Sequence, residues 1–345
     1  MQRLVFWGIV ILVFLLVFGI IGLICDQIFY RIIKLFLEKH TANMVRLITF
    51  IVVMITVITS VLVGHYITRL RVHINNIEIA SDRVPKSFEG FKIAQISDFH
   101  IDSFDPEKEM YFVEEIVDKI LAEKPDIICF TGDLVTIRSA QALPFRSALK
   151  RLTSTGIPVY GTMGNHDYAD YVREFDEARR EKDRDSLRLI MREAGWRVLD
   201  NCSEKIYRGS DSILIAGVGN IGEPPFTTYG DLNTALQASA PVYDDDFTVL
   251  LSHNPTHWRD EIIPDTKIDL MLAGHTHAMQ MKIFGWCPSK TKYKEYAGLY
   301  QEGKQFLYVN TGLGCTGPRI RIGVKPEISV IKIARKGAKA QRRGF

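Results

Sequence analysis

The sequence of 345 residues has few cysteines and little excess charge. Its five cysteines are an odd number without a Cys-x-x-Cys pair, so neither a disulfide framework nor a cysteine-ligated zinc site is indicated. The net charge of +3 is spread along the chain, without the basic stripe that binds nucleic acid. Internal repeats and low-complexity segments are also absent. We therefore expect neither a disulfide-stapled scaffold nor nucleic-acid binding.

The composition instead suits a folded chain. With 47% hydrophobic and 24% charged residues, the chain can bury one large core or two smaller ones. Cys129 lies inside an apolar run and is interpreted as a small core residue.

Two long apolar runs lie near the N-terminus. Residues 4–24 contain no charge and are long enough to span a bilayer, and residues 47–63 form a second run. We expect two transmembrane helices, because a signal peptide has a shorter apolar region and a small-residue cleavage site. The connecting residues 26–46 fit either an interfacial helix or a solvated hairpin.

Two spans place the N-terminus and everything after residue 63 on the same side of the membrane. Positive charges on the two sides nearly balance, so the positive-inside rule does not decide the orientation. Our working assignment is a multi-pass protein of the cell membrane with its globular part in the cytoplasm. The predicted divisions are an anchor over residues 1–68, a globular domain over 69–334 and a basic tail over 335–345.

The globular part alternates runs of strand and helix character, which predicts an α/β fold. An edge strand is expected at 72–79, and residues 196–199 and 213–218 are expected in a second sheet. Helices are expected at 106–123 and 143–152 and within the charged stretch 171–194. Further apolar strands are expected at 93–96, 126–130, 159–163, 247–251 and 268–272.

Each of these last five strands ends in side chains that bind metal ions. They are Asp98 and His100, Asp133, Asn165 and His166, His253, and His275 and His277. A single histidine at a strand end is usually structural, but five strand tips brought together by a parallel sheet predict a metal site. Oxygen and imidazole ligands without cysteine suit Mn, Fe or Zn. The ligands are too many for one ion, so we predict two divalent ions that share a carboxylate and clamp a phosphoryl group.

The motifs Asp-x-His, Gly-Asp-Leu, Gly-Asn-His-Asp, Ser-His and Gly-His-Thr-His, in this order, resemble those of the calcineurin-like metallophosphoesterase superfamily. The resemblance covers about residues 88–333, and the C-terminal part is similar to membrane-associated bacterial phosphoesterases of the YkuE and YaeI type. It implies two mixed β-sheets packed face to face with helices outside. The chain departs from the family pattern at Ala278-Met279-Gln280, where many relatives have Gly-Gly-Gln. This difference leaves the metal ligands intact, but the substrate contacts that relatives make there need not be shared.

The resemblance also implies a role for each site residue. A first metal would be held by Asp98, His100 and His277, a second by Asn165, His253 and His275, and Asp133 would bridge them. A water or hydroxide between the ions would be the nucleophile. His166 would protonate the leaving oxygen or stabilise the developing charge, and Asp167 would orient His166.

Residues near these motifs are assigned no part in the reaction. His257 and Trp258 are interpreted as packing residues. Arg319 and Arg321 lie near the C-terminal loops, and we prefer a surface role for them over a phosphate contact.

Two functions remain open. The first is a membrane-anchored phosphohydrolase acting on a phosphate ester or pyrophosphate, and the alternative is a catalytically silent adaptor with the same fold. The presence of both Asp133 and His166 favours the enzyme. The anchor favours a lipid-linked substrate, with a soluble substrate as the alternative.

Overall fold

The computed structural model describes residues 26–224, 226–237 and 246–337. Backbone contacts divide the chain into one unit of residues 1–65 and another of residues 66–345.

The described part of the first unit is helical. Residues 26–33 form a helix, and after a turn the long helix α2 (Lys39–Tyr66) begins. Nε of Arg46 in α2 donates a hydrogen bond to Oδ1 of Asp26 at 2.7 Å, which ties the two helical segments together.

Helix α2 has the dimensions of a membrane span. Its 28 residues rise by about 1.5 Å each, which gives about 42 Å against a bilayer hydrocarbon core of about 30 Å. Among the residues that the structure describes, the stretch Lys39–Leu70 is the one helix long and apolar enough to cross a membrane. The other predicted span, residues 4–24, lies outside the described residues, so an anchor of two spans stays a prediction.

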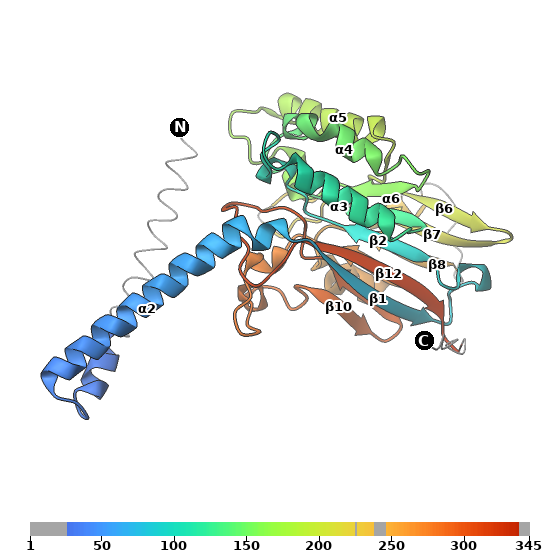
Figure 1. The fold of residues 1–345 in the computed structure, drawn as a ribbon. Helices are drawn as coiled ribbons and strands as arrows, with labels where there is room; N and C mark the ends of the chain where they lie inside the picture. The colour runs from blue at the N-terminus through green and yellow to red at the C-terminus, as the bar shows by residue number, and fades with distance from the viewer. Residues whose placement is uncertain (1–25, 225, 238–245, 338–345) are drawn as a thin grey trace. The chain divides into compact units, whose positions relative to one another are not determined.

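The second unit contains two six-stranded mixed sheets (Figure 1). The first sheet has the order β1 (His73–Ser81), β12 (Glu327–Arg335), β2 (Lys92–Ile96), β3 (Ile127–Thr131), β4 (Val159–Thr162) and β5 (Arg197–Val198). The second sheet has the order β10 (Gly298–Glu302), β11 (Gln305–Val309), β9 (Leu270–Ala273), β8 (Phe247–Leu251), β7 (Asp211–Gly217) and β6 (Cys202–Arg208). Strands β2 to β5 run parallel to one another, as do β7, β8, β9 and β11.

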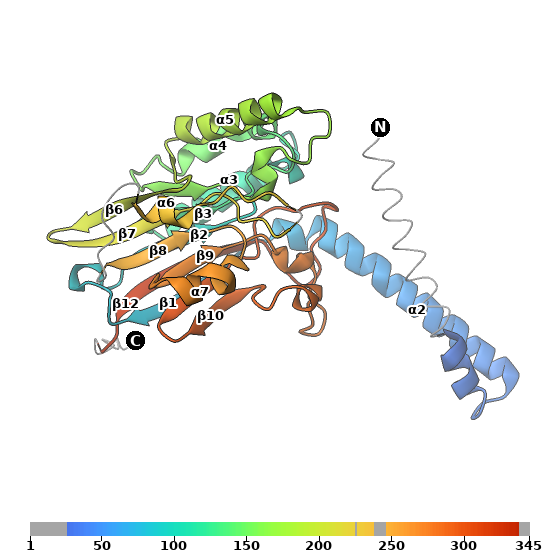
Figure 2. The ribbon, with the colours of Figure 1, turned by 180° about the vertical axis from the view of Figure 1, so that it is seen from behind.

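Three apolar cores separate the layers. Ile93 and Ile127 of the first sheet pack with Val249 of the second in the core between the sheets. Their chain neighbours Ala94 and Ile128 point the other way. They face the helices α3 (Met110–Ala122), α4 (Arg146–Arg151) and α5 (Glu177–Glu193) (Figure 2). A third core lies between the second sheet and the helices α6 (Leu232–Gln237) and α7 (Ile263–Asp265). Because successive strand side chains point to opposite faces, both faces are buried and the central strands are continuous apolar runs.

The structure confirms β1 as an edge strand and Cys129 as a buried core residue, and it corrects two strand assignments. Residues 197–198 pair with β4 in the first sheet and not with the second sheet. The ligand-bearing strands are not in one parallel sheet, since β2, β3 and β4 belong to the first sheet and β8 and β9 to the second. Local apolar patterns identify strands, but the pairing of strands depends on long-range contacts that those patterns do not contain.

Candidate metal centre

The loops after five strands meet at one edge of the sandwich, and both sheets contribute to it. From the first sheet come Asp98 and His100 after β2, Asp133 after β3, and Asn165 and His166 after β4. From the second sheet come His253 after β8, and His275 and His277 after β9. The structure therefore brings together the ligand residues predicted from the sequence.

Asp98, His100 and His277 form one donor group. The Nε2 atoms of His100 and His277 are 3.1 Å apart, and Nε2 of His277 is 3.1 Å from Oδ1 of Asp98. All three side chains are buried. Two imidazole nitrogens at this distance need a proton or a cation between them, because two lone pairs would repel. The group fits one metal ion.

Asn165, His253 and His275 form a second group. Oδ1 of Asn165 is 2.8 Å from Nδ1 of His275 and 3.2 Å from Nε2 of His253, and these two nitrogens are 3.3 Å apart. An amide oxygen and two imidazoles are ligand types that suit Mn, Fe and Zn.

Asp133 lies between the two groups. Its Oδ2 is 3.5 Å from Nε2 of His100 and 3.1 Å from Nε2 of His253. Its Oδ1 accepts a hydrogen bond from the backbone N–H of His166 at 2.9 Å. One carboxylate oxygen thus faces both groups, as a bridging ligand must.

The imidazoles are held in tautomers that suit metal binding. Nδ1 of His253 is 2.7 Å from the carbonyl oxygen of Thr131, and because a carbonyl only accepts, this Nδ1 carries the proton. Nδ1 of His100 is 3.1 Å from Oγ1 of Thr136, whose hydroxyl donates to Asp102. Both rings therefore turn Nε2 toward the cluster, where this nitrogen can bind a cation in place of a proton, which is the usual effect of outer partners on metal-binding histidines.

Burial and charge shift the pKa values in the cluster in opposite directions. Burial alone would raise the pKa of Asp98, but His277 holds it well below its ordinary value. Burial lowers the pKa of His275 to about 3, so this ring is neutral. Burial also opposes protonation of His253, but Asp133 overcomes it and raises the pKa of His253 to about 9. The buried carboxylates of Asp98 and Asp133 are stabilised by positive charge in the cluster. A divalent cation would supply more of this charge than one imidazolium.

The backbone of the ligand loops is strained. Positive φ angles occur at Asp98 (47°), His100 (36°), Asp133 (61°), His275 (71°) and His277 (50°). The left-handed region costs about 1–2 kcal/mol for each residue with a Cβ. Such strain persists where the surrounding fold enforces it, and it gathers at functional sites.

His166 lies beside the cluster without belonging to either group. Its ring centroid is 4.9 Å from that of His100, and its Nδ1 donates to the carbonyl oxygen of Thr136 at 2.7 Å. Its position also allows a shared ion with His100 and Asp133, so the geometry admits a ligand role as well as a catalytic one.

Asp167 does not make the contact expected of it. Its carboxylate accepts backbone N–H groups from Gly164, Asp133, Leu134 and Val135 at 2.8–3.2 Å. Thr136 takes the expected orienting contact with the His166 ring. Asp167 is buried, and burial together with the charge of Asp133 raises its pKa to about 7. It positions the loop that carries Asp133.

The two arginines considered as surface residues differ from each other. Arg319 is exposed and donates to the carbonyl oxygen of Asp102 at 2.8 Å. Arg321 is fully buried and donates to the carbonyl oxygens of Thr311, Gly312 and Gly314, so a surface role is wrong for this residue.

His257 and Trp258 are buried, as expected of packing residues. Sequence reasoning missed Thr136, Tyr171 and Tyr293. The phenol oxygen of Tyr293 is 3.1 Å from Nε2 of His275, and that of Tyr171 accepts from Asn165 at 2.9 Å. No local pattern marks these residues, because only the fold brings them to the cluster.

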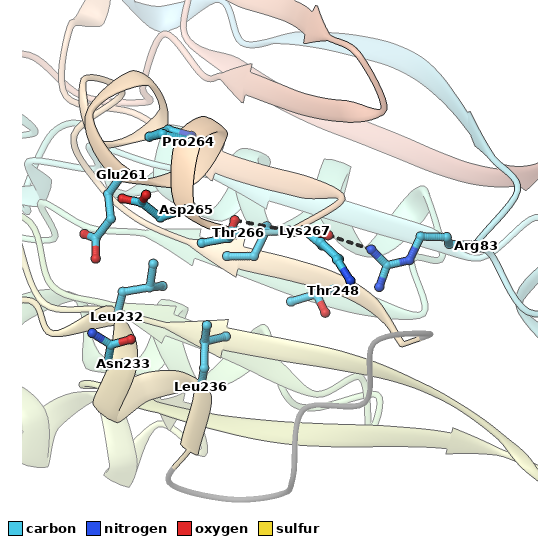
Figure 3. A pocket seen from close by; sticks show the side chains of 11 residues that line it. Arg83, Leu232, Asn233, Leu236, Thr248, Glu261, Pro264, Asp265, Thr266 and Lys267 are labelled. Atoms are coloured by element: carbon cyan, nitrogen blue, oxygen red, sulfur yellow. Dashed lines mark hydrogen bonds between the residues drawn. The ribbon is translucent and has the colours of Figure 1, made fainter.

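A cavity of about 630 Å³ lies elsewhere in the second unit (Figure 3). Arg83, Thr248 and Lys267 are among its lining residues. Thr248 is near the start of β8 and Ile268 precedes β9, so the cavity lies at the amino ends of the strands whose carboxyl ends carry His253 and His275. None of the predicted ligands lines it.

Comparison with known proteins agrees with this geometry. A profile of the calcineurin-like phosphoesterase family matches residues 91–279. The metallophosphoesterase YkuE of Bacillus subtilis is 30% identical over 74% of this chain and 83% of its own length.

Two further relatives have names that state an activity or a membrane location. The UDP-2,3-diacylglucosamine pyrophosphatase LpxG of Chlamydia trachomatis is 29% identical over 72% of this chain and 86% of its own length. A transmembrane protein with a metallophosphoesterase domain from Danio rerio is 26% identical over 74% of this chain and 56% of its own length.

The role of Asp167 in holding the loop gives a test of stability. In Asp167→Asn, the new side-chain NH2 group would face backbone N–H groups that now donate to the carboxylate. Buried donors would then be unpaired, which should lower the free energy of unfolding by about 2–3 kcal/mol. We expect the thermal midpoint of the purified protein to fall by about 5 °C or more, measured by circular dichroism. Asp170→Asn is the matched control, because among the described residues the side chain of Asp170 accepts hydrogen bonds only from the Tyr229 hydroxyl. Equal midpoints for the two variants would contradict the assignment.

Proposed function

The chain belongs to the calcineurin-like phosphoesterase family and is therefore a metal-dependent phosphoester hydrolase. We propose that it hydrolyses a phosphate ester or pyrophosphate carried on a lipid, and that the residues at this edge of the sandwich would hold two divalent ions for this reaction. The proposal rests on the buried Oδ2 of Asp133. This oxygen lies between His100 of the first donor group and His253 of the second. An adaptor without turnover would not need this arrangement.

Each ion has its own ligand set in this proposal. Asp98, His100 and His277 would hold the first ion, and Asp133 would be shared between the two. Asn165, His253 and His275 would hold the second ion. The mixture of carboxylate, amide and imidazole favours Mn, Fe or Zn.

The ions when bound polarise the phosphoryl oxygens and lower the pKa of water, so that a nucleophile exists near neutral pH. The protein supplies the proton for the leaving oxygen. Nδ1 of His166 donates to the carbonyl oxygen of Thr136, so the second ring proton of the imidazolium form lies on Nε2, and Nε2 would give that proton to the leaving oxygen. Burial excludes bulk water around the carboxylates and strengthens their hold on the cations.

Membrane association supports a lipid-borne substrate. Helix α2 has the length and composition of a span, and one relative carries the name of a transmembrane protein. Another relative is named for a pyrophosphatase of a diacylated sugar nucleotide. An enzyme held at the bilayer meets lipid head groups at a high effective concentration.

The bridging role predicts the metal content of variants. Asp133→Asn should lose both ions and lower turnover by about a hundred-fold or more, because a neutral amide bridges two cations poorly. Asn165→Ala should weaken mainly the second ion. Elemental analysis of the purified proteins tests both. Asp269→Asn is the control, since Asp269 is also buried but lies before β9, where it accepts from the backbone of Thr248. Retention of two ions by Asp133→Asn would refute the bridge.

The proton-donor role separates chemistry from binding. His166→Ala should keep the wild-type metal content and lower turnover by about a hundred-fold to ten-thousand-fold, the usual contribution of a positioned acid. Metal content and the rate on a chromogenic phosphate ester are measured on the same sample. A loss of metal that parallels the loss of rate would make His166 a ligand.

The substrate proposal is tested by separating the anchor from the site. A truncated protein that starts at Arg71 retains every proposed ligand, so it should keep its rate on a small soluble ester. On a lipid pyrophosphate embedded in vesicles, its rate should fall by about ten-fold or more relative to the full chain. An unchanged vesicle rate would show that the anchor does not select the substrate, and the argument from the anchor to a lipid-linked substrate would fail.

A further inference from the structure

The segment after the last histidine motif carries an exposed apolar hairpin, residues 281–286. Ile283, Phe284 and Trp286 have exposed fractions of 43%, 106% and 53%. The backbone N–H of Ile283 donates to the carbonyl of Trp286, and that of Trp286 donates back, both at 2.9 Å. Phe284 and Gly285 between them have φ of 48° and 82°, the left-handed turn of a two-residue hairpin. The turn presents a fully exposed phenylalanine at its tip.

The base of this apolar hairpin is braced against the rest of the domain. The N–H of Lys282 donates to the carbonyl of Ile322 at 2.7 Å, and the N–H of Ile322 donates to that of Gln280 at 2.8 Å. Ala278, Cys287 and Val324 form a small buried cluster beneath it. The base of the apolar hairpin is therefore fixed to the domain, while its exposed side chains lie outside the buried cluster.

Both ends of the segment that contains the hairpin, residues 278–293, reach the metal centre. The segment starts directly after His277, whose Nε2 belongs to the first donor group. At its far end the hydroxyl of Tyr293 lies 3.1 Å from Nε2 of His275 in the second group. The apolar hairpin is therefore connected at both ends to residues of the candidate metal site.

The chain segment that contains the apolar hairpin carries positive charge. Residues 279–294 contain Lys282, Lys290, Lys292 and Lys294, all of them exposed, and no carboxylate. Nζ of Lys292 lies 3.3 Å from Oε2 of Glu223, whereas the other three lysines form no ion pair with the described carboxylates. An exposed aromatic tip flanked by lysines is complementary to an apolar layer beneath anionic groups.

We propose that the apolar hairpin inserts into the surface of a bilayer that contains anionic lipid. Phe284 and Trp286 enter the boundary between head groups and acyl chains, and the lysines contact the anionic head groups. A bilayer is the occupant because the chain itself carries a helix with the length and composition of a span. This insertion of the hairpin does not depend on which substrate the enzyme has. It would hold the metal site at the depth of lipid head groups.

The test measures whether Trp286 contacts acyl chains. The full chain is reconstituted into vesicles of phosphatidylcholine and phosphatidylglycerol, with or without bromine on the acyl chains, and tryptophan emission is recorded. The chain has four tryptophans, so the difference between wild type and Trp286→Phe isolates the emission of Trp286. We expect brominated chains to quench this difference. Its persistence without quenching would overturn the proposal.

Two variants examine the tip and the charge. Phe284→Asp, and Lys282→Glu combined with Lys290→Glu, should each reduce the quenching of Trp286 while leaving the rate on a soluble ester in detergent unchanged. Leu189→Asp is the control, because Leu189 is 54% exposed on α5 and outside the segment. Wild-type quenching in Phe284→Asp would overturn the proposal. A shift of Trp286 emission with protein concentration in detergent alone would instead identify a second copy of the chain as the occupant.

Discussion

The close approach of buried carboxylates and imidazoles at one edge of the sandwich is the constraint on which the rest of the structure depends. Asp98 and Asp133 are almost completely buried, where an unpaired carboxylate would be strongly unfavourable. Both oxygens of Asp98, which follows β2, lie 3.0 Å from the backbone N–H of His275, which follows β9. This contact joins the two sheets at the place where their ligands meet. The sheets must therefore end together for either carboxylate to be satisfied.

The glycines of the ligand motifs follow from the same crowding. A Cβ on Gly164 would lie 2.3 Å from Oδ1 of Asp133, and a Cβ on Gly274 would lie 2.2 Å from Oδ2 of Asp98. A side chain at either position would push a carboxylate out of the cluster. These glycines are required for close approach to the metal ligands, and the left-handed ligands beside them carry the strain of the same tight loops.

Chemistry and location are built from different parts of the chain. The ligand loops belong to a rigid two-sheet scaffold, which keeps donor atoms at defined distances. The apolar hairpin and α2 contribute no donor to the cluster, and both expose large apolar side chains such as Phe284 and Phe50. The family accounts for the hydrolytic chemistry, whereas family membership by itself does not identify the substrate.

The sequence by itself determined the family, the α/β character and the set of candidate ligand residues, because each candidate metal-binding motif is a short local pattern after an apolar strand. The order of the motifs identified the superfamily, and the family profile and the relatives confirm it. Local patterns also placed β8 and β1 close to their observed bounds.

Only the tertiary structure decided how those residues act together. The pairing of β5 with β4, the contact of Thr136 with His166 and that of Tyr293 with His275 join residues far apart in the chain. The same holds for Asp167, whose neighbour in sequence is His166 but whose carboxylate reaches the loop after β3. Adjacent side chains in a tight turn point in different directions, and the direction that each one takes is set by which buried donors need an acceptor.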